Sequence, residues 1–300
     1  LRSFIDLLQQ SPPPLAVIRS CTWQPIDPVG YEDFTIKASD DGEEKTVMIS
    51  PDIAICENCQ NEVKDRHDRR YLYPFTNCTN CGPRFTIIKD VPYDRAQTTM
   101  EAFPMCPECQ YEYEEPLQRR FHAQPNACPV CGPRTTLVDQ QGKPVQEDVH
   151  SLLKAGHIIA VKGLGAFHLA VDAKNTAAVR RLREKKVRDA KPFAVMVREL
   201  AVAHKYCRIS PSEESWLRHR TAPIVIMQTR ENSGLDAGII HPGLNTLGVM
   251  LPYTPLHYLL FDDYLEILVM TSANISDEPL VTDNQTAVQT LAGVADFFLL

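Results

Sequence analysis

The feature that most constrains this chain is a cysteine pattern that occurs twice, fifty residues apart. The first copy pairs C-x2-C at residues 56–59 with C-x2-C-Gly-Pro-Arg at 78–84, and the second copy repeats this at 106–109 and 128–134. Eighteen residues separate the two cysteine pairs in each copy. Between residues 54 and 90, twelve of thirty-seven positions are identical to the position fifty residues later. A repeat of this quality indicates a duplicated module.

The chemistry of the cysteines predicts two structural zinc sites. Each C-x2-C turn places two thiolates side by side, and two such turns complete the tetrahedral four-sulfur set that suits Zn²⁺. Because protein sulfurs would take all four positions, none stays open for water, and the ions are expected to be structural. We expect one zinc ion per repeat, and exchange of cysteine pairs between repeats is the alternative. The expected ligands are Cys56, Cys59, Cys78 and Cys81 in the first repeat, and Cys106, Cys109, Cys128 and Cys131 in the second.

Disulfide bonds are the competing interpretation of these cysteines. Paired C-x2-C turns at this spacing are typical of metal sites, and no secretory segment is recognisable before them. We therefore expect a reducing, cytoplasmic compartment. No apolar run approaches the roughly 20 residues of a membrane-spanning helix, so no membrane partner is expected.

Zinc repeats raise the question of nucleic-acid binding, which the charge of this chain opposes. The formal net charge is −7, and residues 51–140 contain ten Lys and Arg against thirteen Asp and Glu. Four thiolates around each zinc ion would make this region more negative. A protein that binds phosphate backbones needs the opposite sign. The repeats are therefore interpreted as a scaffold or docking surface.

The chain divides into three parts by composition. Residues 1–20 combine an amphipathic segment with three prolines, and we expect them to be the tail of a preceding domain. Residues 21–140 are expected to form the zinc-finger region, ended by a polar, turn-forming break near 140–144. Residues 145–300 alternate short apolar strands with helices, which predicts an α/β domain with one main twisted sheet. Because the last residues form an apolar strand, we expect this domain to be incomplete.

Individual elements follow from hydrophobic periodicity and from capping residues. A strand pair is expected within residues 21–50, and Ser50-Pro51 is expected to start a helix. In the α/β domain, helices are expected at 149–155, 175–186, 199–207 and 283–291, and strands at 157–161, 193–197, 223–227, 266–270 and 297–300.

Three stretches of the α/β domain are candidates for chemistry. A glycine-containing loop at 162–168 follows a predicted strand, where the backbone can approach a small anion, and a plain tight turn is the alternative. Seven Lys and Arg lie within residues 180–191, which suits a triphosphate or pyrophosphate, although such a run is usually a solvated helix face. Hydroxyl and amide groups at 271–276 follow a buried strand, which suits phosphate oxygens or a capping turn. His168 is either a general base or a structural histidine.

These residues carry a family resemblance. The doubled cysteine array, together with Arg120-Phe-His-Ala-Gln-Pro125, resembles the zinc-finger region of the HypF carbamoyltransferases, which mature nickel–iron hydrogenases. Residues 162–169, 191–196, 242–252 and 270–274 are similar to the YrdC-like domain of that family. The resemblance covers nearly the whole chain, and the zinc array joined to a YrdC-like domain makes it specific.

The resemblance implies a carbamoyl transfer in three stages. An N-terminal acylphosphatase-like domain releases carbamate from carbamoyl phosphate, and the YrdC-like domain adenylates carbamate with ATP, giving carbamoyl-AMP and pyrophosphate. A C-terminal domain passes the carbamoyl group to the C-terminal cysteine of HypE, towards the cyanide ligands of iron. This chain is expected to hold the tail of the first domain, the zinc region and most of the YrdC-like domain.

The resemblance also assigns roles by position. The phosphates of ATP, with Mg²⁺, are expected to contact Lys186, Arg188, Lys191, Thr271, Ser272 and Asn274. The residues expected to take part in catalysis are Lys162, His168, Lys186 and Arg188, with the 162–168 loop lining the carbamate pocket. Ala166 and Val171 depart from the family pattern, and so does Asp277, which leaves the role of Ser276 open.

Two other functions compete with this interpretation. Threonylcarbamoyl-AMP synthase, a tRNA-modifying relative, shares the YrdC-like domain but lacks the doubled zinc array. A non-catalytic zinc scaffold or RNA-binding module is the third possibility. The acidic zinc region opposes RNA binding, although the basic cluster at 180–191 would permit it. Loss of ATP binding on substitution of Lys186 and Arg188 would separate an enzyme from a scaffold.

Overall fold

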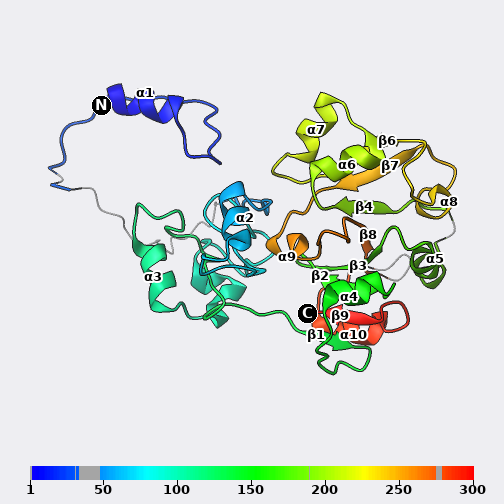
Figure 1. The fold of residues 1–300 in the computed structure, drawn as a ribbon. Coiled ribbons are helices and arrows are strands. Elements are labelled where there is room, and N and C mark those ends of the chain that lie inside the picture. The colour runs from blue at the N-terminus through cyan, green and yellow to red at the C-terminus, as the bar shows by residue number, and fades with distance from the viewer. Residues whose placement is uncertain (1, 31, 34–47, 189, 275–278) are drawn as a thin grey trace.

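The computed structural model describes residues 2–30, 32–33, 48–188, 190–274 and 279–300 (Figure 1). The first helix, α1 (Arg2–Gln10), has no buried residue and lies apart from the other elements. Most of the strand pair expected within 21–50 falls on residues outside the described ranges. The zinc repeats and the sheet domain follow along the chain.

Each zinc repeat contains one short helix that starts directly after its first cysteine. These helices are α2 (Glu57–Lys64) and α3 (Pro107–Glu114), and the short 3-10 helices η1 (Arg95–Gln97) and η2 (Thr99–Ala102) lie between them. The helix start expected at Ser50-Pro51 is wrong. Ile53 instead forms an isolated antiparallel bridge with Gly82, which keeps this segment extended.

The remaining elements form one mixed α/β domain with a nine-stranded sheet in the order β1-β9-β2-β3-β8-β4-β7-β6-β5. The strands are β1 (Leu137–Asp139), β2 (Ile159–Lys162), β3 (Phe167–Asp172), β4 (Ala194–Val197), β5 (Cys207–Arg208), β6 (Val225–Thr229), β7 (Thr246–Met250), β8 (Ile267–Ser272) and β9 (Phe297–Leu299). The helices are α4 (Val149–Lys154), α5 (Thr176–Lys185), α6 (Leu200–Tyr206), α7 (Pro211–Leu217), α8 (Ala237–Ile240), α9 (Pro255–Tyr258) and α10 (Asn284–Leu291).

The predicted α/β domain with one main sheet is confirmed. The helices expected from residue 149 onward correspond to α4, α5, α6 and α10, and the expected strands correspond to β2, β4, β6, β8 and β9. The sheet is mixed, because β2–β9 and β4–β7 pair in parallel while β2–β3, β3–β8 and β4–β8 are antiparallel. The strands β1, β3, β5 and β7 were not predicted.

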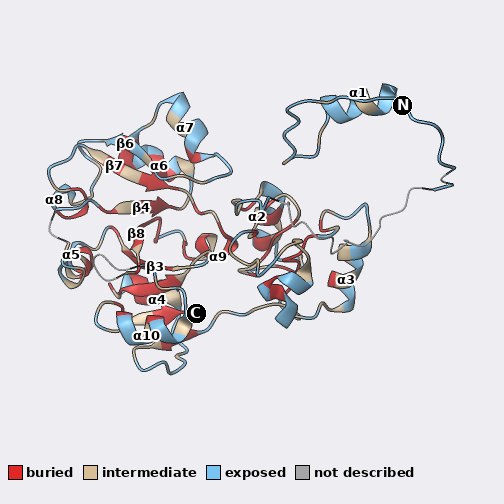
Figure 2. Cartoon of the chain, turned by 180° about the vertical axis from the view of Figure 1, so that it is seen from behind, coloured by how far each residue is buried: buried red, intermediate tan, exposed pale blue. Residues whose placement is uncertain are grey.

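Helices cover both faces of the sheet, so the central strands are apolar on both sides (Figure 2). Along β2, Ala160 faces a core that also contains residues of α5, α6, α8 and α10. Its neighbours Ile159 and Val161 face the opposite core, with residues of α4 and α9. Alternate side chains of a strand point to opposite faces, and burial on both faces explains the continuous apolar runs of the sequence.

The zinc region is joined to the sheet domain by backbone hydrogen bonds at two places. The amide of Ala54 donates to the carbonyl of Arg220 at 3.0 Å, and the amide of Ile55 donates to the carbonyl of Tyr253 at 3.0 Å. Thr136 and Leu300 exchange two bonds of 2.9 Å, immediately before β1 pairs with β9. The sheet therefore begins at β1, ahead of the break predicted near 140–144. None of the described helices is long and apolar enough to traverse a lipid bilayer.

Candidate functional site

The glycine-containing stretch is a β-hairpin. Lys162 ends β2, residues 163–166 form the connection, and His168 lies on β3 instead of in a loop as expected. The amide of Gly163 donates to the carbonyl of Ala166 at 2.9 Å, which closes the connection. Gly165 has a φ of +74°, a conformation that favours glycine.

The basic cluster meets the hydroxyl and amide loop at the end of β8. Helix α5 ends at Lys185, and Lys186 is its C-cap. The ammonium group of Lys186 donates to the carbonyl of Ser272 at 2.6 Å and to that of Asn274 at 3.2 Å. Two segments more than eighty residues apart in sequence thus form one cluster.

Arg188 completes this cluster from the same connection. Its Nη1 donates to Oγ1 of Thr271 at 3.0 Å, and its Nη2 donates to the carbonyl of Pro192 at 2.6 Å. Ser272 Oγ donates to Oδ1 of Asn274 at 2.8 Å. Ser276 and Asp277 lie outside the described residues.

A cavity of about 520 Å³ opens beside this cluster. Its polar lining includes five predicted site residues and one acidic residue of the zinc region, and Met250 and Met270 are among its apolar lining residues. These six residues are His168, Arg188, Lys191, Thr271, Ser272 and Asp52. The cavity is therefore cationic on the side of the α5–β4 connection, and the zinc region forms part of its wall.

The electrostatics of the cluster favour an anion. Burial, followed by the charges of Arg188 and Lys191, lowers the pKa of Lys186 to about 8. Burial and the charge of Arg183 lower the pKa of Arg188. Each cation makes its neighbours harder to protonate, and an anion bound among them would relieve this repulsion. Groups shifted in this way cluster at functional sites.

Lys162 borders a second cavity of about 480 Å³ between the hairpin and the zinc region. Its ammonium group donates to Oδ1 of Asn284 at 2.6 Å, and burial lowers its pKa. Leu164 and Tyr253 line both cavities. Of the residues expected around carbamate, His168 therefore faces the first cavity and Lys162 the second.

Two aromatic residues beside His168 were not identified from the sequence. His257 on α9 is fully buried, and neither ring nitrogen has a hydrogen-bond partner among the residues that the structure describes. Its ring centroid lies 6.1 Å from that of His168 and 4.3 Å from that of Tyr253. Burial and the charge of His168 lower the pKa of His257 to about 3, so it is neutral near pH 7. The sequence signal near His257 is Thr254, three residues earlier, which is the N-cap of α9. A capping residue predicts the start of a helix and does not indicate a binding site.

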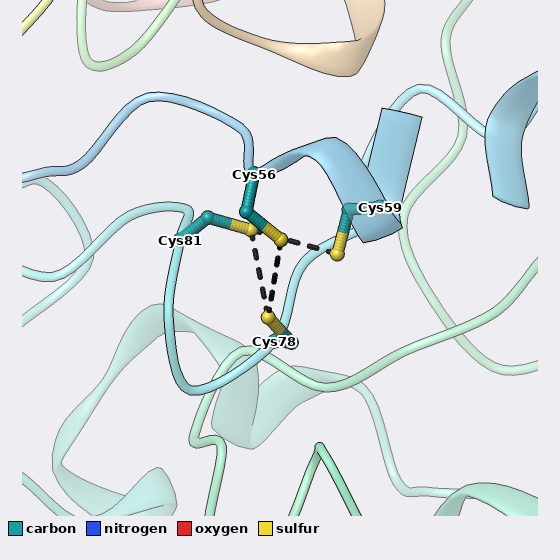
Figure 3. Close-up of side chains that lie close together, drawn as sticks. All are labelled: Cys56, Cys59, Cys78 and Cys81. Atoms are coloured by element: carbon teal, nitrogen blue, oxygen red, sulfur yellow. Dashed lines mark hydrogen bonds between the residues drawn. The ribbon is translucent and has the colours of Figure 1, made fainter. Parts of the chain in front are cut away.

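The four cysteines of each repeat converge on one point, as Figure 3 shows for the first repeat. In the first cluster, Sγ of Cys78 lies 3.7 Å from that of Cys56 and 3.8 Å from that of Cys81, and Cys81 lies 3.5 Å from Cys59. In the second cluster the corresponding distances are 3.7, 3.8 and 3.6 Å. The expectation that each repeat closes its own cluster is confirmed, and no cysteine forms a disulfide.

These clusters fit a tetrahedral zinc ion. Four sulfurs about 2.3 Å from Zn²⁺ at the corners of a tetrahedron lie about 3.8 Å from one another. The observed separations of 3.5–3.8 Å are close to this value. The all-sulfur donor set selects a soft or borderline metal over Mg²⁺ or Ca²⁺.

Comparison with known proteins decides the family. Residues 55–88 and 105–138 match the family described as "HypF finger", and residues 151–300 match the family described as "Telomere recombination" (Sua5, YciO and YrdC proteins). Carbamoyltransferase HypF2 of Cupriavidus necator is 48% identical in an alignment of 323 positions, which covers 98% of this chain and 39% of that protein. Carbamoyltransferase HypF of Synechocystis sp. is 45% identical in an alignment of 306 positions, which covers 100% of this chain and 40% of that protein.

The chain belongs to the HypF family. It spans about two fifths of the length of these HypF carbamoyltransferases. The solved structure described as full-length HypF in the phosphate- and nucleotide-bound form superposes with a TM-score of 0.91 at 47% identity, over 100% of this chain and 39% of that one. HypF of T. kodakarensis superposes with a TM-score of 0.89 at 44% identity, with the same coverage. The arrangement of zinc repeats and sheet domain is therefore that of HypF.

Proposed function

We propose that this chain activates carbamate with ATP, as a step in the carbamoyl transfer for which its HypF relatives are named. In this proposal carbamate comes from carbamoyl phosphate, and the acceptor is the C-terminal cysteine of HypE. The observation that carries the proposal is the cluster in which Lys186 and Arg188 meet the end of β8 beside the first cavity. The relatives named carbamoyltransferase, and the nucleotide-bound form of one HypF, support it.

The cluster suits the phosphates of ATP. Lys186, Arg188 and Lys191 supply positive charge, and the guanidinium group offers a planar pair of donors that matches phosphate oxygens. The hydroxyl groups of Thr271 and Ser272 add neutral donors at the end of β8. The 520 Å³ cavity falls within the range of small-molecule and nucleotide sites.

The proposed reaction is an attack of a carbamate oxygen on the α-phosphorus of ATP. A bond forms between that oxygen and the α-phosphorus, the bond to the oxygen bridging the α- and β-phosphorus breaks, and pyrophosphate leaves with its electron pair. Preorganised cations stabilise the negative charge that develops on the phosphate oxygens. Mg²⁺ bound with ATP supplies further charge compensation. His168, whose pKa burial lowers, is neutral near pH 7, and we propose that it contacts carbamate.

We further propose that the two four-cysteine clusters hold structural Zn²⁺. All four ligands of each ion come from the protein, and three of the four sulfurs in the first cluster are fully buried. Such closed sites stabilise a fold and take no part in chemistry. Because Asp52, Ile53 and Ala54 line the first cavity, the zinc region also shapes the proposed ATP site.

The test of adenylation uses the full-length protein and follows pyrophosphate release from ATP. Freshly generated carbamate is expected to stimulate release, whereas threonine with bicarbonate is not. Stimulation by threonine alone would contradict the proposal in favour of threonylcarbamoyl adenylation.

Substitution tests the phosphate-binding cluster separately. K186A with R188A is expected to lower the affinity for ATP at least about tenfold, because two charged contacts to phosphate are lost. R180A is the matched control, since Arg180 belongs to the same basic run but is exposed on α5. Unchanged ATP affinity in the double variant, with the fold retained by circular dichroism, would contradict the assignment of the cluster.

A further inference from the structure

Each four-cysteine cluster is contacted by a pair of arginines from the other repeat. Arg69-Arg70 lies between the two cysteine pairs of the first repeat, and Arg119-Arg120 occupies the same position in the second. Sequence proximity would place each pair beside its own cluster. In the structure, each pair instead contacts the cysteines and the helix of the other repeat.

The first arginine pair contacts the second cluster. Nη2 of Arg69 donates to Sγ of Cys109 at 3.3 Å and to Sγ of Cys106 at 3.5 Å. Nη2 of Arg70 lies 3.6 Å from the same Cys109 sulfur, and its guanidinium group forms two bonds of 2.9 and 2.6 Å to the Glu112 carboxylate. Arg70 is only 1% exposed, so its charge is compensated inside the protein.

The second arginine pair, Arg119-Arg120, makes the equivalent contacts to the first cluster. Nη1 of Arg119 donates to Sγ of Cys59 at 2.9 Å and lies 4.0 Å from that of Cys56. Arg119 and Arg120 both form ion pairs with the carboxylate of Glu62. Glu62 and Glu112 are themselves fifty residues apart, so the crossed ion pairs of the two repeats are equivalent, and Arg120 also lies 3.6 Å from the Glu112 carboxylate of its own repeat.

The exchange extends to the backbone beside the third cysteine of each cluster. Nε of Arg70 donates to the carbonyl of Ala127 at 2.9 Å, and Nε of Arg120 donates to the carbonyl of Asn77 at 3.0 Å. Ala127 and Asn77 directly precede Cys128 and Cys78. Each arginine pair thus positions both cysteine turns of the opposite cluster.

The charge of a four-thiolate zinc site explains why such contacts stabilise metal binding. Zn²⁺ with four thiolates carries a net charge of −2, and burial of that charge is costly unless donors or cations compensate it. Guanidinium N–H groups directed at thiolates provide charge-assisted hydrogen bonds. Removal of such outer partners typically costs about 10–100-fold in metal affinity.

Each arginine pair also lies in the loop that its own metal site closes. The eighteen residues between Cys59 and Cys78 contain Arg69-Arg70, and a metal bound by these cysteines holds both ends of that loop. Closing the loop beforehand lowers the entropy cost of placing the arginines against the other cluster. We propose that Arg69-Arg70 and Arg119-Arg120 are positioning residues for the opposite cluster, and that the two clusters bind Zn²⁺ as a coupled pair.

The first test maps which cluster weakens when one arginine is replaced. Zinc-loaded R69Q and R119Q proteins are treated with a chelator and N-ethylmaleimide, and the alkylation rate of each cysteine is measured by peptide mass spectrometry. R69Q is expected to accelerate alkylation of the second-repeat cysteines about tenfold, and R119Q that of the first-repeat cysteines. Arg69 and Arg119 are partly exposed, at 33% and 22% of their side chains, so the buried Arg70 and Arg120 keep the fold.

The matched control is R134Q, because Arg134 is exposed and its side chain donates to the carbonyl of Pro129 in its own repeat, at 3.5 Å. R134Q is expected to leave both alkylation rates within about twofold of wild type. Acceleration confined to the mutated repeat, equal acceleration in both repeats, or no acceleration would each overturn the crossed assignment.

The coupling itself is tested by a double-mutant cycle. C56S with C59S empties the first cluster and is expected to accelerate alkylation of the second-repeat cysteines about tenfold. Adding R69Q to that variant is expected to change the alkylation rate of the second-repeat cysteines by less than about twofold. Without metal in the first cluster, the loop that contains Arg69 is no longer closed, so the arginine has already lost its support. A full additional tenfold acceleration would show that Arg69 acts independently of the first metal, and would overturn the coupling.

Discussion

At Lys186 the chain keeps an ammonium group where its surroundings oppose a charge. Burial and two neighbouring cations lower the pKa to about 8, while the carbonyls of Ser272 and Asn274 accept hydrogen bonds from the group. The folded pKa lies below the unfolded value, so the charged form destabilises the fold at neutral pH. The free energy of unfolding therefore increases as the pH rises above about 8, until the lysine of the unfolded chain also loses its proton.

The same shift predicts how ATP binding depends on pH. Between pH 7 and pH 9 the wild-type protein is expected to lose affinity for ATP, because Lys186 loses the charge that attracts phosphate. K186R is expected to abolish most of this loss, since a guanidinium group keeps its proton. Isothermal titration calorimetry at the two pH values measures both effects.

K185R provides the comparison for this experiment. Lys185 lies on the same helix end but donates to the carbonyl of Val294, away from β8. The variant is expected to retain the wild-type pH dependence. A pH dependence in K186R as steep as in wild type would contradict a role for Lys186 in phosphate binding.

The β2–β3 hairpin shows how an element is shaped by its contact with the zinc region. Gly165 has a φ of +74°, and a Cβ atom there would lie 2.9 Å from Cγ2 of Thr86. Thr86 is itself held by Asp52, whose Oδ1 accepts from its hydroxyl at 3.1 Å. The connection therefore has no room for a side chain on the surface that faces the first zinc repeat.

G165A is expected to destabilise the protein by about 2–4 kcal/mol, from left-handed strain and the clash together. G234A is the matched control, because Gly234 has a φ of +75° and, apart from its chain neighbours, no described residue has a heavy atom within 4 Å of an added Cβ. It is expected to cost only about 1–2 kcal/mol. Urea unfolding measures both values.

A second substitution isolates the clash. T86S keeps the hydroxyl group that bonds Asp52 but removes Cγ2, so G165A with T86S is expected to approach the stability of G234A. Equal costs for G165A and G234A would show that the hairpin does not press on the zinc region.

At the scale of elements, the sequence predicts apolar strands and capped helices but misses strands that pairing creates. β4 and the first four residues of β8 are continuous apolar runs. Asn175 caps the start of α5, where its Oδ1 accepts a hydrogen bond from the amide of Ala178 at 3.0 Å. β7 contains Gly248, which weakens a strand signal, yet it is held between β4 and β6. Neighbouring strands supply the hydrogen bonds that decide such cases.

For the whole molecule, the zinc region and the sheet domain depend on one another at both cavities. The first cavity includes Asp52, Ile53 and Ala54, and the second is lined by residues of both parts, including Phe75, Met100 and Leu256. The backbone bond from Ile55 to Tyr253 holds the parts together between these cavities. We therefore expect loss of zinc from the cysteine clusters to weaken ATP binding at the proposed site.

Zinc removal tests this dependence. A zinc-selective chelator, with Mg²⁺ in excess, is expected to lower the affinity for ATP at least about fivefold, because the wall of the first cavity loses its support. The β-sheet signal in circular dichroism is expected to persist, since the nine-stranded sheet has its own two cores. Restored affinity after zinc is added back is the control, and unchanged affinity without zinc would contradict the dependence.

The sequence by itself determined the two four-cysteine sites, the α/β class of the second half and most of its helices. These depend on ligand chemistry at fixed spacing and on local periodicity, which are written along the chain. Tertiary structure alone decided that Lys186 meets Ser272, that Lys162 and His168 border different cavities, and that each arginine pair serves the opposite cluster. Such contacts join residues far apart in sequence, and only the packing of the whole chain selects which of many possible partners is reached.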